Sequence, residues 1–231
     1  MHRRQFIGST VAASVALFAH GRAGAAESGP LAPMPKRERV KVAFMLGDNA
    51  NVIDTAGPWE VFQDTMKAVD GDHRDAFELY TVAPTVKNLR MTGGLEVKPK
   101  YSIADAPQPH VIVVPAHKST GASREWLRAA SAGTDVTMSV CTGAFQLARA
   151  GLLKGIPATT HHDFFEDFAK EFPDIELRRG LRFVDSGRIA TAGGLTSGID
   201  MALHVVARYF GVETAARTAE YMEYTSDAWR A

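Results

Sequence analysis

The sequence predicts an α/β fold in which a mostly parallel sheet is sandwiched between helices. Short β-rich segments alternate with segments whose apolar residues recur at the spacing of one helical face. The run H-V-I-V-V-P at residues 110–115 has the continuous apolar character of a central parallel strand buried on both faces. At residues 136–143 a buried strand changes directly into a helix, and a cysteine lies at the change of period.

The first half of the chain is expected to contribute two strands and a hairpin. Residues 40–46 (V-K-V-A-F-M-L) form the first strand and residues 77–82 the second. Between them, Pro58 fits the first turn of a helix, where its missing N–H costs nothing. The apolar face expected for this helix comprises Val61, Phe62, Thr65, Met66 and Val69. Two extended runs around residues 92–94 predict a hairpin beside the sheet.

The middle of the chain is expected to continue the alternation. A helix over residues 123–132 leads into the strand before the cysteine, and the next helix begins near Ala144. The apolar positions of that helix are Ala144, Leu147, Ala148, Gly151 and Leu152. A short strand over residues 157–161 should follow it.

The last third is expected to hold two or three short strands and three helices. Residues 163–172 place four phenylalanines at helical spacing, as a core-facing stripe would. The strands fall within residues 175–192, with D-S-G at 185–187 as a hairpin turn. Thr196 or Ser197 should cap the next helix, Asp200 should complete a capping box and Gly211 should end the helix. The last helix spans residues 213–222.

Cys141, the only cysteine, occupies the bend between strand and helix. Ser139 and Gly143, two residues before and after it, are small, which is the pattern of a nucleophile elbow. Amides at the start of a helix favour a thiolate, so we expect the Cys141 pKa to fall below its free value of about 8.5. The Thr142 amide should face an anion forming beside the sulfur. The alternative is a small buried hydrophobe, which most free cysteines are.

Other chemically able residues also follow predicted strands. Asp54, the pair Ala116-His117, and His161 each come just after one, as Cys141 does. Ligands of open α/β sheets bind outside the carboxyl ends of the strands. These residues are therefore expected to converge on one edge of the sheet.

The N-terminus has the layout of an export signal. Paired arginines, Arg3 and Arg4, precede a short apolar run over residues 11–19 and the small-residue sequence A-G-A at 23–25. We expect a twin-arginine signal peptide at 1–26, a flexible leader at 27–39, a single domain at 40–231 and a periplasmic location. The apolar run is too short to span a membrane.

Composition narrows the partners. The 26 basic and 26 acidic residues balance, with no basic stripe, so we expect no nucleic-acid partner and no membrane span. A lone cysteine cannot form an internal disulfide, so in an oxidising compartment it is buried, paired between chains or kept for reactivity.

Residues 40–222 resemble the ThiJ/PfpI superfamily, which has a flavodoxin-like, class I glutamine-amidotransferase-like fold. The resemblance is carried by D-T-A-G-P-W-E-V-F at 54–62, V-C-T-G-A-F at 140–145, G-L-L at 151–153, A-T-T-H at 158–161 and T-A-G-G at 191–194. The most similar branch holds isonitrile hydratases and the sensor domains of AraC-type regulators. The resemblance implies a small-molecule substrate, a homodimer and no cofactor.

The resemblance also implies roles for individual residues. Cys141 matches the nucleophile, Asp54 the acid that approaches it, and Thr142 the residue whose hydroxyl and amide face the site. His161 matches a histidine that some branches place near the cysteine. Two of these residues also have a structural alternative. Asp54 would then be a helix cap, and His161 a hydrogen-bonded interior histidine.

Further motif residues are assigned to the oxyanion or binding region. They are Ala116, His117, Gly57 and Glu60, with a purely structural role as the alternative for Glu60. The family usually has Pro-Gly-Gly where this chain has Pro115-Ala116-His117, so side chains enter a space that glycine leaves open. After His161 the related branch often has tryptophan, and this chain has His162.

A metal site is the alternative use of these imidazoles. His117, His161, His162 and Asp163 include common zinc ligands. Adjacent histidines in an extended segment point to opposite sides and rarely reach one ion. We therefore predict no metal.

Three functions fit the residues. The first is cysteine-dependent hydration or hydrolysis of a small electrophile, as in an isonitrile hydratase: sulfur attacks the terminal carbon, Asp54 protonates it, and water releases an N-substituted formamide. The second is a non-catalytic ligand-binding or sensor module in the periplasm. The third is redox or carbonyl-stress protection through oxidation of Cys141 or its attack on a glyoxal.

Overall fold

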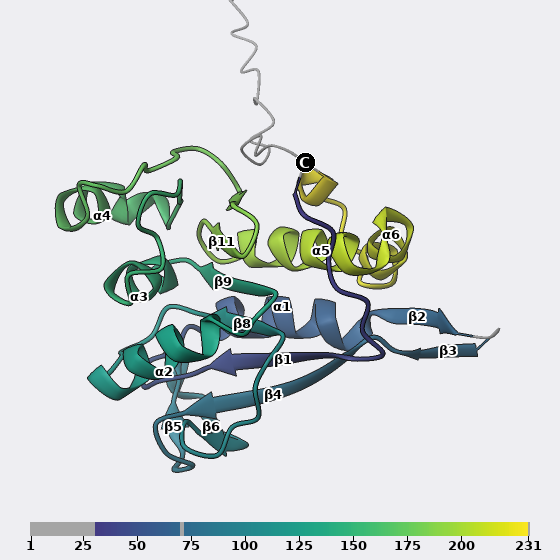
Figure 1. Ribbon diagram of the computed structural model, residues 1–231, viewed down its shortest axis with the longest axis horizontal. Coiled ribbons are helices and arrows are strands. Elements are labelled where there is room, and N and C mark those ends of the chain that lie inside the picture. The colour runs from purple at the N-terminus through teal and green to yellow at the C-terminus, as the bar shows by residue number, and fades with distance from the viewer. Residues whose placement is uncertain (1–30, 70–71, 231) are drawn as a thin grey trace, which may run out of the picture.

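The computed structural model describes residues 31–69 and 72–230 and confirms the predicted fold class (Figure 1). A seven-stranded sheet has the order β10-β11-β9-β8-β1-β4-β7. Its parallel strands are β1 (Val40–Met45), β4 (Phe77–Ala83), β7 (Tyr101–Ser102), β8 (Val111–Val114), β9 (Val136–Val140) and β11 (Ile189–Ala192). Only β10 (Phe183–Asp185) is antiparallel in this sheet, where it pairs with β11 around the predicted turn at 185–187.

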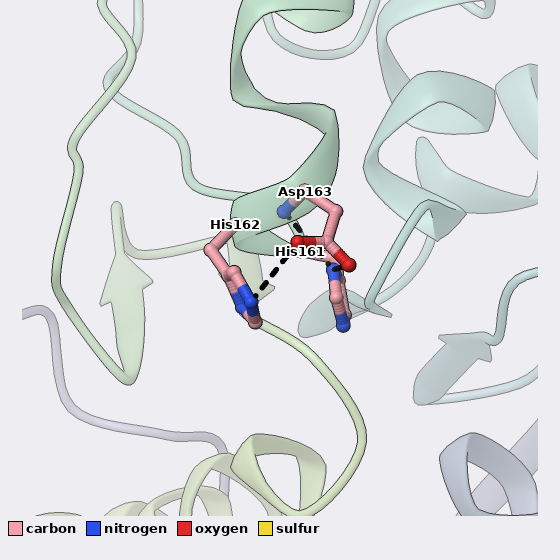
Figure 2. Close-up of side chains that lie close together, drawn as sticks. All are labelled: His161, His162 and Asp163. Atoms are coloured by element: carbon pink, nitrogen blue, oxygen red, sulfur yellow. Dashed lines mark hydrogen bonds and ion pairs between the residues drawn. The ribbon is translucent and has the colours of Figure 1, made fainter.

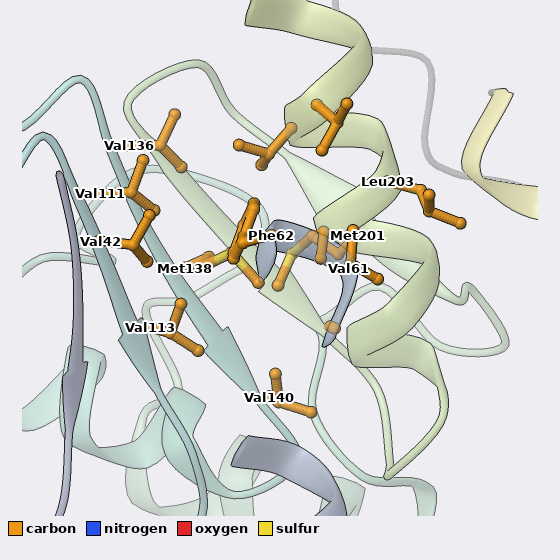
Figure 3. Packing of buried hydrophobic residues seen from close by; sticks show 14 of the residues in the cluster. Val42, Val61, Phe62, Val111, Val113, Val136, Met138, Val140, Met201 and Leu203 are labelled. Carbon is orange, nitrogen blue, oxygen red and sulfur yellow. The ribbon is translucent and has the colours of Figure 1, made fainter. Parts of the chain in front are cut away.

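Helices cover both faces of the sheet, so its central strands are apolar on both sides. One face packs against α1 (Val52–Asp64), α5 (Ser197–Phe210) and α6 (Val212–Tyr221). Figure 3 shows this layer, in which Val111, Val136 and Met138 meet Phe62 and Met201. The opposite face packs against α2 (Gly121–Ser131), α3 (Gly143–Arg149) and α4 (Phe165–Glu171).

Two small hairpins lie outside the main sheet. The pair β5 (Leu89–Arg90) and β6 (Glu96–Val97) is the hairpin predicted around residues 92–94. The pair β2 (Met66–Val69) and β3 (Asp72–Asp75) was not predicted. Met66 and Val69 therefore belong to a strand, and the expected helical face that included them is wrong because α1 ends at Asp64.

Several other local predictions were wrong. Pro58 lies inside α1, because the Asn51 side chain, seven residues earlier, caps the helix by accepting from the amides of Ile53 and Asp54. Residues 157–161 form only an isolated bridge, between Ala158 and Leu177. The capping box at α5 does not form. Asp200 is fully buried and accepts hydrogen bonds from Arg182 and Ser226 instead.

The phenylalanine stripe is partly a core element. Phe168 is fully buried and packs on Phe145 and Phe172, whereas Phe164 is 40% exposed. The expected helix breaks into a 3₁₀ turn at His162–Phe164 followed by α4. This turn determines where the histidines point.

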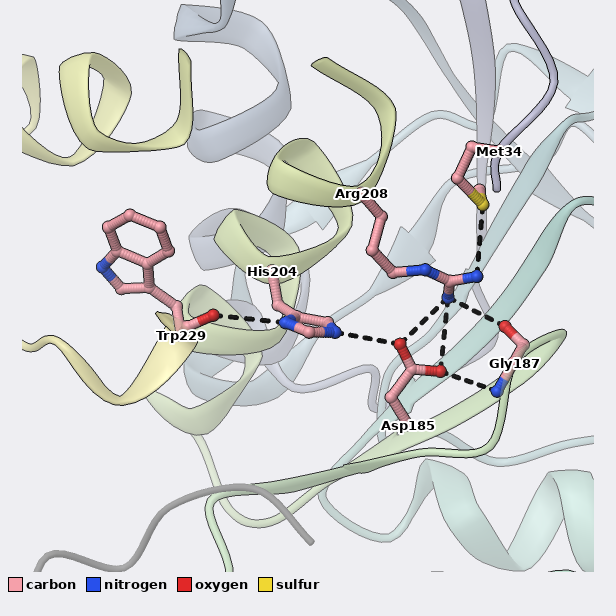
Figure 4. Close-up of polar contacts among 6 residues, drawn as sticks. All are labelled: Met34, Asp185, Gly187, His204, Arg208 and Trp229. Atoms are coloured by element: carbon pink, nitrogen blue, oxygen red, sulfur yellow. Dashed lines mark hydrogen bonds and ion pairs between the residues drawn. The ribbon is translucent and has the colours of Figure 1, made fainter. Parts of the chain in front are cut away.

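A polar cluster ties the amino edge of the sheet to α5 (Figure 4). Asp185 accepts from His204 Nε2 (2.9 Å) and from Arg208 Nη1 (3.0 Å). His204 Nδ1 lies 3.2 Å from the Trp229 carbonyl, so the cluster also holds the C-terminal turn. These groups bind one another at the edge opposite to the carboxyl ends of the strands, which indicates a structural role.

The expected signal peptide at 1–26 and the first residues of the expected leader lie outside the described residues. Within the described residues, no helix is both long and apolar enough to cross a membrane.

Candidate active site

The carboxyl edge of the sheet brings together Asp54, Ala116 and Cys141. Asp54 is in the first turn of α1, Ala116 follows β8, and Cys141 follows β9. The Ala116 amide donates a 3.1 Å hydrogen bond to Asp54 Oδ2, and the Asp54 charge raises the pKa of Cys141. The side chain of Asp54 thus faces Ala116 and Cys141. The alternative role of Asp54 as a helix cap is wrong, because Asn51 caps α1.

Cys141 sits at a sharp bend with a left-handed backbone. Its φ is +58°, a conformation that L residues adopt only when surrounding contacts hold it. Both sides of the residue are anchored: its amide donates to the Gly193 carbonyl (2.8 Å), and its carbonyl accepts from Thr160 Oγ1 (2.9 Å). The side chain is 6% exposed.

Gly143, two residues after Cys141, has no room for a side chain. A Cβ on Gly143 would lie 2.0 Å from the Val114 carbonyl oxygen, because the start of α3 rests on the end of β8. No real side chain tolerates such a contact with backbone. The elbow geometry expected from Ser139 and Gly143 is therefore present.

Asp54 is a buried acid with one free oxygen. The residue is 0% exposed, and its Oδ1 accepts no hydrogen bond from the described residues. Burial raises its pKa to about 6, against the opposing effects of the Ala116 amide, the Cys141 thiol and the Leu195 amide. An acid with a pKa close to neutrality can both accept and return a proton.

The Cys141 thiol is not the activated thiolate expected from its position before a helix. Burial, and then the negative charge of Asp54, raise its pKa to about 11. The amides of Thr142 and Leu195 oppose this rise without reversing it. The prediction of a lowered pKa was wrong because the amides of Thr142 and Leu195 affect the thiol less than burial beside a carboxylate does. At neutral pH the proton resides on sulfur.

Leu195 is the site residue that sequence reasoning missed. Its N–H faces both Asp54 and Cys141, and its φ is +52°. It directly follows the T-A-G-G motif at 191–194, but a leucine in left-handed conformation carries no sequence signal.

Two further candidates, His117 and Ala116, follow strand β8. His117 is buried against Gly47, its Nδ1 lies 2.8 Å from the Pro115 carbonyl, and its Nε2 has no partner among the described residues. Burial lowers the His117 pKa, so the ring is neutral. The Ala116 amide donates its hydrogen bond to Asp54. It is therefore not available to an oxyanion while Asp54 is ionised.

Gly57 and Glu60 serve α1 and not the thiol. A Cβ on Gly57 would lie 2.9 Å from Ile199 Cγ1, so the glycine allows α1 and α5 to pack closely. Glu60 is exposed and accepts from Gln63 Nε2. This hydrogen bond stays within α1, as the structural alternative expects, and a binding role for Glu60 stays a prediction.

His161 lies beside the Cys141 loop. Its ring packs on Gly194, where an added Cβ would lie 2.2 Å from His161 Cδ2. The His161 ring accepts a hydrogen bond from the Asp163 amide (3.2 Å). Among the described residues, no hydrogen bond joins His161 to the Cys141 thiol. A cavity of about 360 Å³ is lined by His161, His162 and the loop 193–197. His161 is therefore placed to contact a ligand and is not hydrogen-bonded to Cys141.

Comparison with known proteins identifies the family to which this fold belongs. A model described as the DJ-1/PfpI family matches residues 40–208. An isonitrile hydratase of Pseudomonas putida is 29% identical over 191 residues, covering 80% of this chain and 78% of that protein. The HTH-type transcriptional regulator GbdR of Pseudomonas aeruginosa is 28% identical over 200 residues, covering 84% of this chain but 53% of the regulator. A crystal structure of a THiJ/PfpI family protein from Pseudomonas syringae superposes with a TM-score of 0.71 at 23% identity, over 92% of this chain and 85% of that one.

Proposed function

Because the chain belongs to the DJ-1/PfpI family, we propose that it hydrates a small electrophile, of the isonitrile class, through Cys141 and Asp54. The observation that carries the proposal is the free Oδ1 of Asp54, buried beside a thiol that the backbone holds at φ +58°. Similarity to an isonitrile hydratase over 80% of the chain supports the substrate class.

The order of the two pKa values sets the first step. With Asp54 near 6 and Cys141 near 11, the resting pair at neutral pH is a carboxylate and a thiol. Asp54 therefore acts first as the base: it takes the thiol proton while sulfur bonds to the terminal isonitrile carbon. Asp54 then returns this proton to the same carbon, which gives a thioimidate. This differs from the expected sequence of events, in which a thiolate attacks and Asp54 only supplies a proton.

Water completes the reaction. Asp54 accepts a proton from the water that adds to the carbon of the thioimidate and passes this proton to the nitrogen. The carbon–sulfur bond then breaks, the proton of the new hydroxyl passes through Asp54 to the sulfur, and the product is an N-substituted formamide. The sum is one isonitrile plus one water, with the enzyme regenerated.

The test is product formation. Purified protein incubated with a small alkyl isonitrile should give the N-alkyl formamide, detected by mass spectrometry with one ¹⁸O incorporated from labelled water. Saturable binding of the isonitrile with no formamide would contradict the proposal.

The pH dependence follows from Asp54 as the base. We expect kcat/KM to rise about tenfold per pH unit below 6, because only the ionised carboxylate can accept the thiol proton, and to level off above it. A rate profile from pH 4.5 to 8.5 measures this. A rate that falls as pH rises through 6 would show that the protonated acid is the active form.

A ligand-binding role is the second candidate. The match to GbdR covers as much of the chain as the match to the hydratase. A thiol with a pKa near 11 is also a poor nucleophile unless a base acts on it. The product assay above separates the two functions.

A redox role has less support. Peroxide reacts with exposed thiolates, and Cys141 is a thiol that is 6% exposed with a raised pKa. We expect intact-mass analysis to show no sulfinic form after a mild peroxide treatment that oxidises a free cysteine peptide. Rapid gain of two oxygens on Cys141 would restore the redox hypothesis.

A further inference from the structure

Three consecutive side chains beside the candidate site, His161, His162 and Asp163, form a compact group of metal-ligand type (Figure 2). One ligand atom from each lies within 4.8 Å of the other two. The 3₁₀ turn at His162–Phe164 replaces the extended backbone that would separate adjacent histidines. As a result the two imidazole rings stack, with centroids 4.4 Å apart and planes at 22°.

We propose that His161, His162 and Asp163 bind one divalent transition-metal ion, with Zn²⁺ as the matching case. Two imidazoles and one carboxylate are ligands that this ion takes at about 2.0–2.2 Å. The prediction of no metal rested on divergent histidines, and the structure removes that reason. The proposal does not depend on the proposed function.

The distances are close to those that coordination requires. Two atoms bound to one tetrahedral zinc lie about 3.3 Å apart, from the bond lengths above. His162 Nε2 is 3.1 Å from Asp163 Oδ1, and His161 Nδ1 is 3.8 Å from Asp163 Oδ2. Because the planes of the stacked rings do not meet at one point, the exposed His162 ring must also turn before both nitrogens can face one ion.

One ligand is fixed and two are free to adjust. The His161 side chain is 15% exposed and rests on Gly194, whereas the side chains of His162 and Asp163 are 75% and 69% exposed. The His161 Nδ1 lone pair now accepts a hydrogen bond of 3.2 Å from the Asp163 amide, at the long end of the usual range. A bond from the ion would replace it.

The surroundings suit a cation with open coordination positions. Arg182, which lines the cavity, is already neutralised by its pair with buried Asp200. Arg179, which lies outside the cavity lining, pairs with Glu166. The cavity of about 360 Å³ gives space for water or an anionic ligand on the ion. Such a three-ligand site leaves at least one position open.

The test uses the full chain carrying Cys141→Ala, so that sulfur contributes neither binding nor catalysis. Zn²⁺ titrated against a chromophoric chelator should show one ion per chain, and Co²⁺ should give the visible absorption of a tetrahedral site. We expect His162→Ala and Asp163→Asn each to weaken Zn²⁺ binding at least about tenfold. Both side chains are exposed, so neither change should disturb folding.

The matched control is His73→Ala on β3, an exposed histidine between Asp72 and Arg74, which should leave the affinity unchanged. Substoichiometric binding would overturn the proposal. So would equal losses in the His73 and His162 variants, because they would indicate nonspecific binding to surface histidines. If no metal site is found, the proposed hydration of isonitriles is unaffected. If no formamide forms, the proposed metal site is likewise unaffected.

Discussion

Replacement of Cys141 by alanine is expected to lower kcat/KM for isonitrile hydration by at least about 10³-fold, the scale of losing a covalent nucleophile. No thioimidate can form without the sulfur. The fold should survive, because alanine keeps a Cβ at φ +58° and the lost atom is small. Formamide production and a thermal melt on the same preparation measure the two effects.

Cys141→Ser is the matched control for this experiment. A hydroxyl is nearly isosteric but far less acidic, so Asp54 cannot deprotonate it efficiently and activity should stay close to that of the alanine variant. Undiminished turnover in either folded variant would remove Cys141 from the mechanism. Retained ligand affinity with lost turnover would fit a catalytic thiol.

Asp54→Asn should have two opposite effects: loss of turnover and a gain in stability at neutral pH. The amide cannot accept the thiol proton, so we expect kcat/KM to fall by about 10²–10⁴-fold. Its oxygen can still accept from the Ala116 amide as Asp54 Oδ2 does. The variant should therefore keep the local geometry.

The stability gain follows from the raised pKa of Asp54. Burial moves this pKa from 3.8 to about 6, so the folded state favours the protonated acid more than the unfolded state does. This contribution is fully present below pH 3.8 and is lost as pH rises through 6. Above pH 6 the ionised carboxylate costs of the order of 3 kcal/mol, which asparagine avoids.

Chemical denaturation at several pH values checks the sign. The difference in unfolding free energy between Asp54→Asn and the parent should grow from pH 4 to pH 7 and then level off. Glu60→Gln on the same helix is the control, since Glu60 is exposed and should show no such growth. A variant that is less stable than the parent at pH 7.5 would contradict the assigned burial cost.

The sheet was predictable because its strands are short, apolar and separated by helical periods. Residues 40–46, 77–82 and 110–115 each became a parallel strand within one or two residues. What failed were local choices decided by tertiary contacts. Asn51 starts α1 before Pro58, and Met66 leaves the helix to pair with Asp75.

The convergence of Asp54 and Cys141 was predictable, but the electrostatics of this pair were not. Asp54 and Cys141 follow strands, so topology alone brought them to one edge. The pKa of Cys141 depends on how deeply the thiol is buried and on the Asp54 charge, and neither can be obtained from sequence spacing. The 3₁₀ turn that aligns His161 with His162 was equally hidden, since the same letters suit an extended segment.

One short loop, residues 193–195, contacts Cys141, Asp54 and His161. The Gly193 carbonyl accepts a hydrogen bond from the Cys141 amide, and Gly194 packs against the His161 ring. The Leu195 N–H faces the Asp54 carboxylate and the Cys141 thiol. Groups that share a support of this kind are energetically coupled, and double substitutions among them depart from additivity. An ion resting on His161 would then alter the affinity of the thiol for its proton, and the thiol's ionisation would alter the affinity for the ion by the same factor.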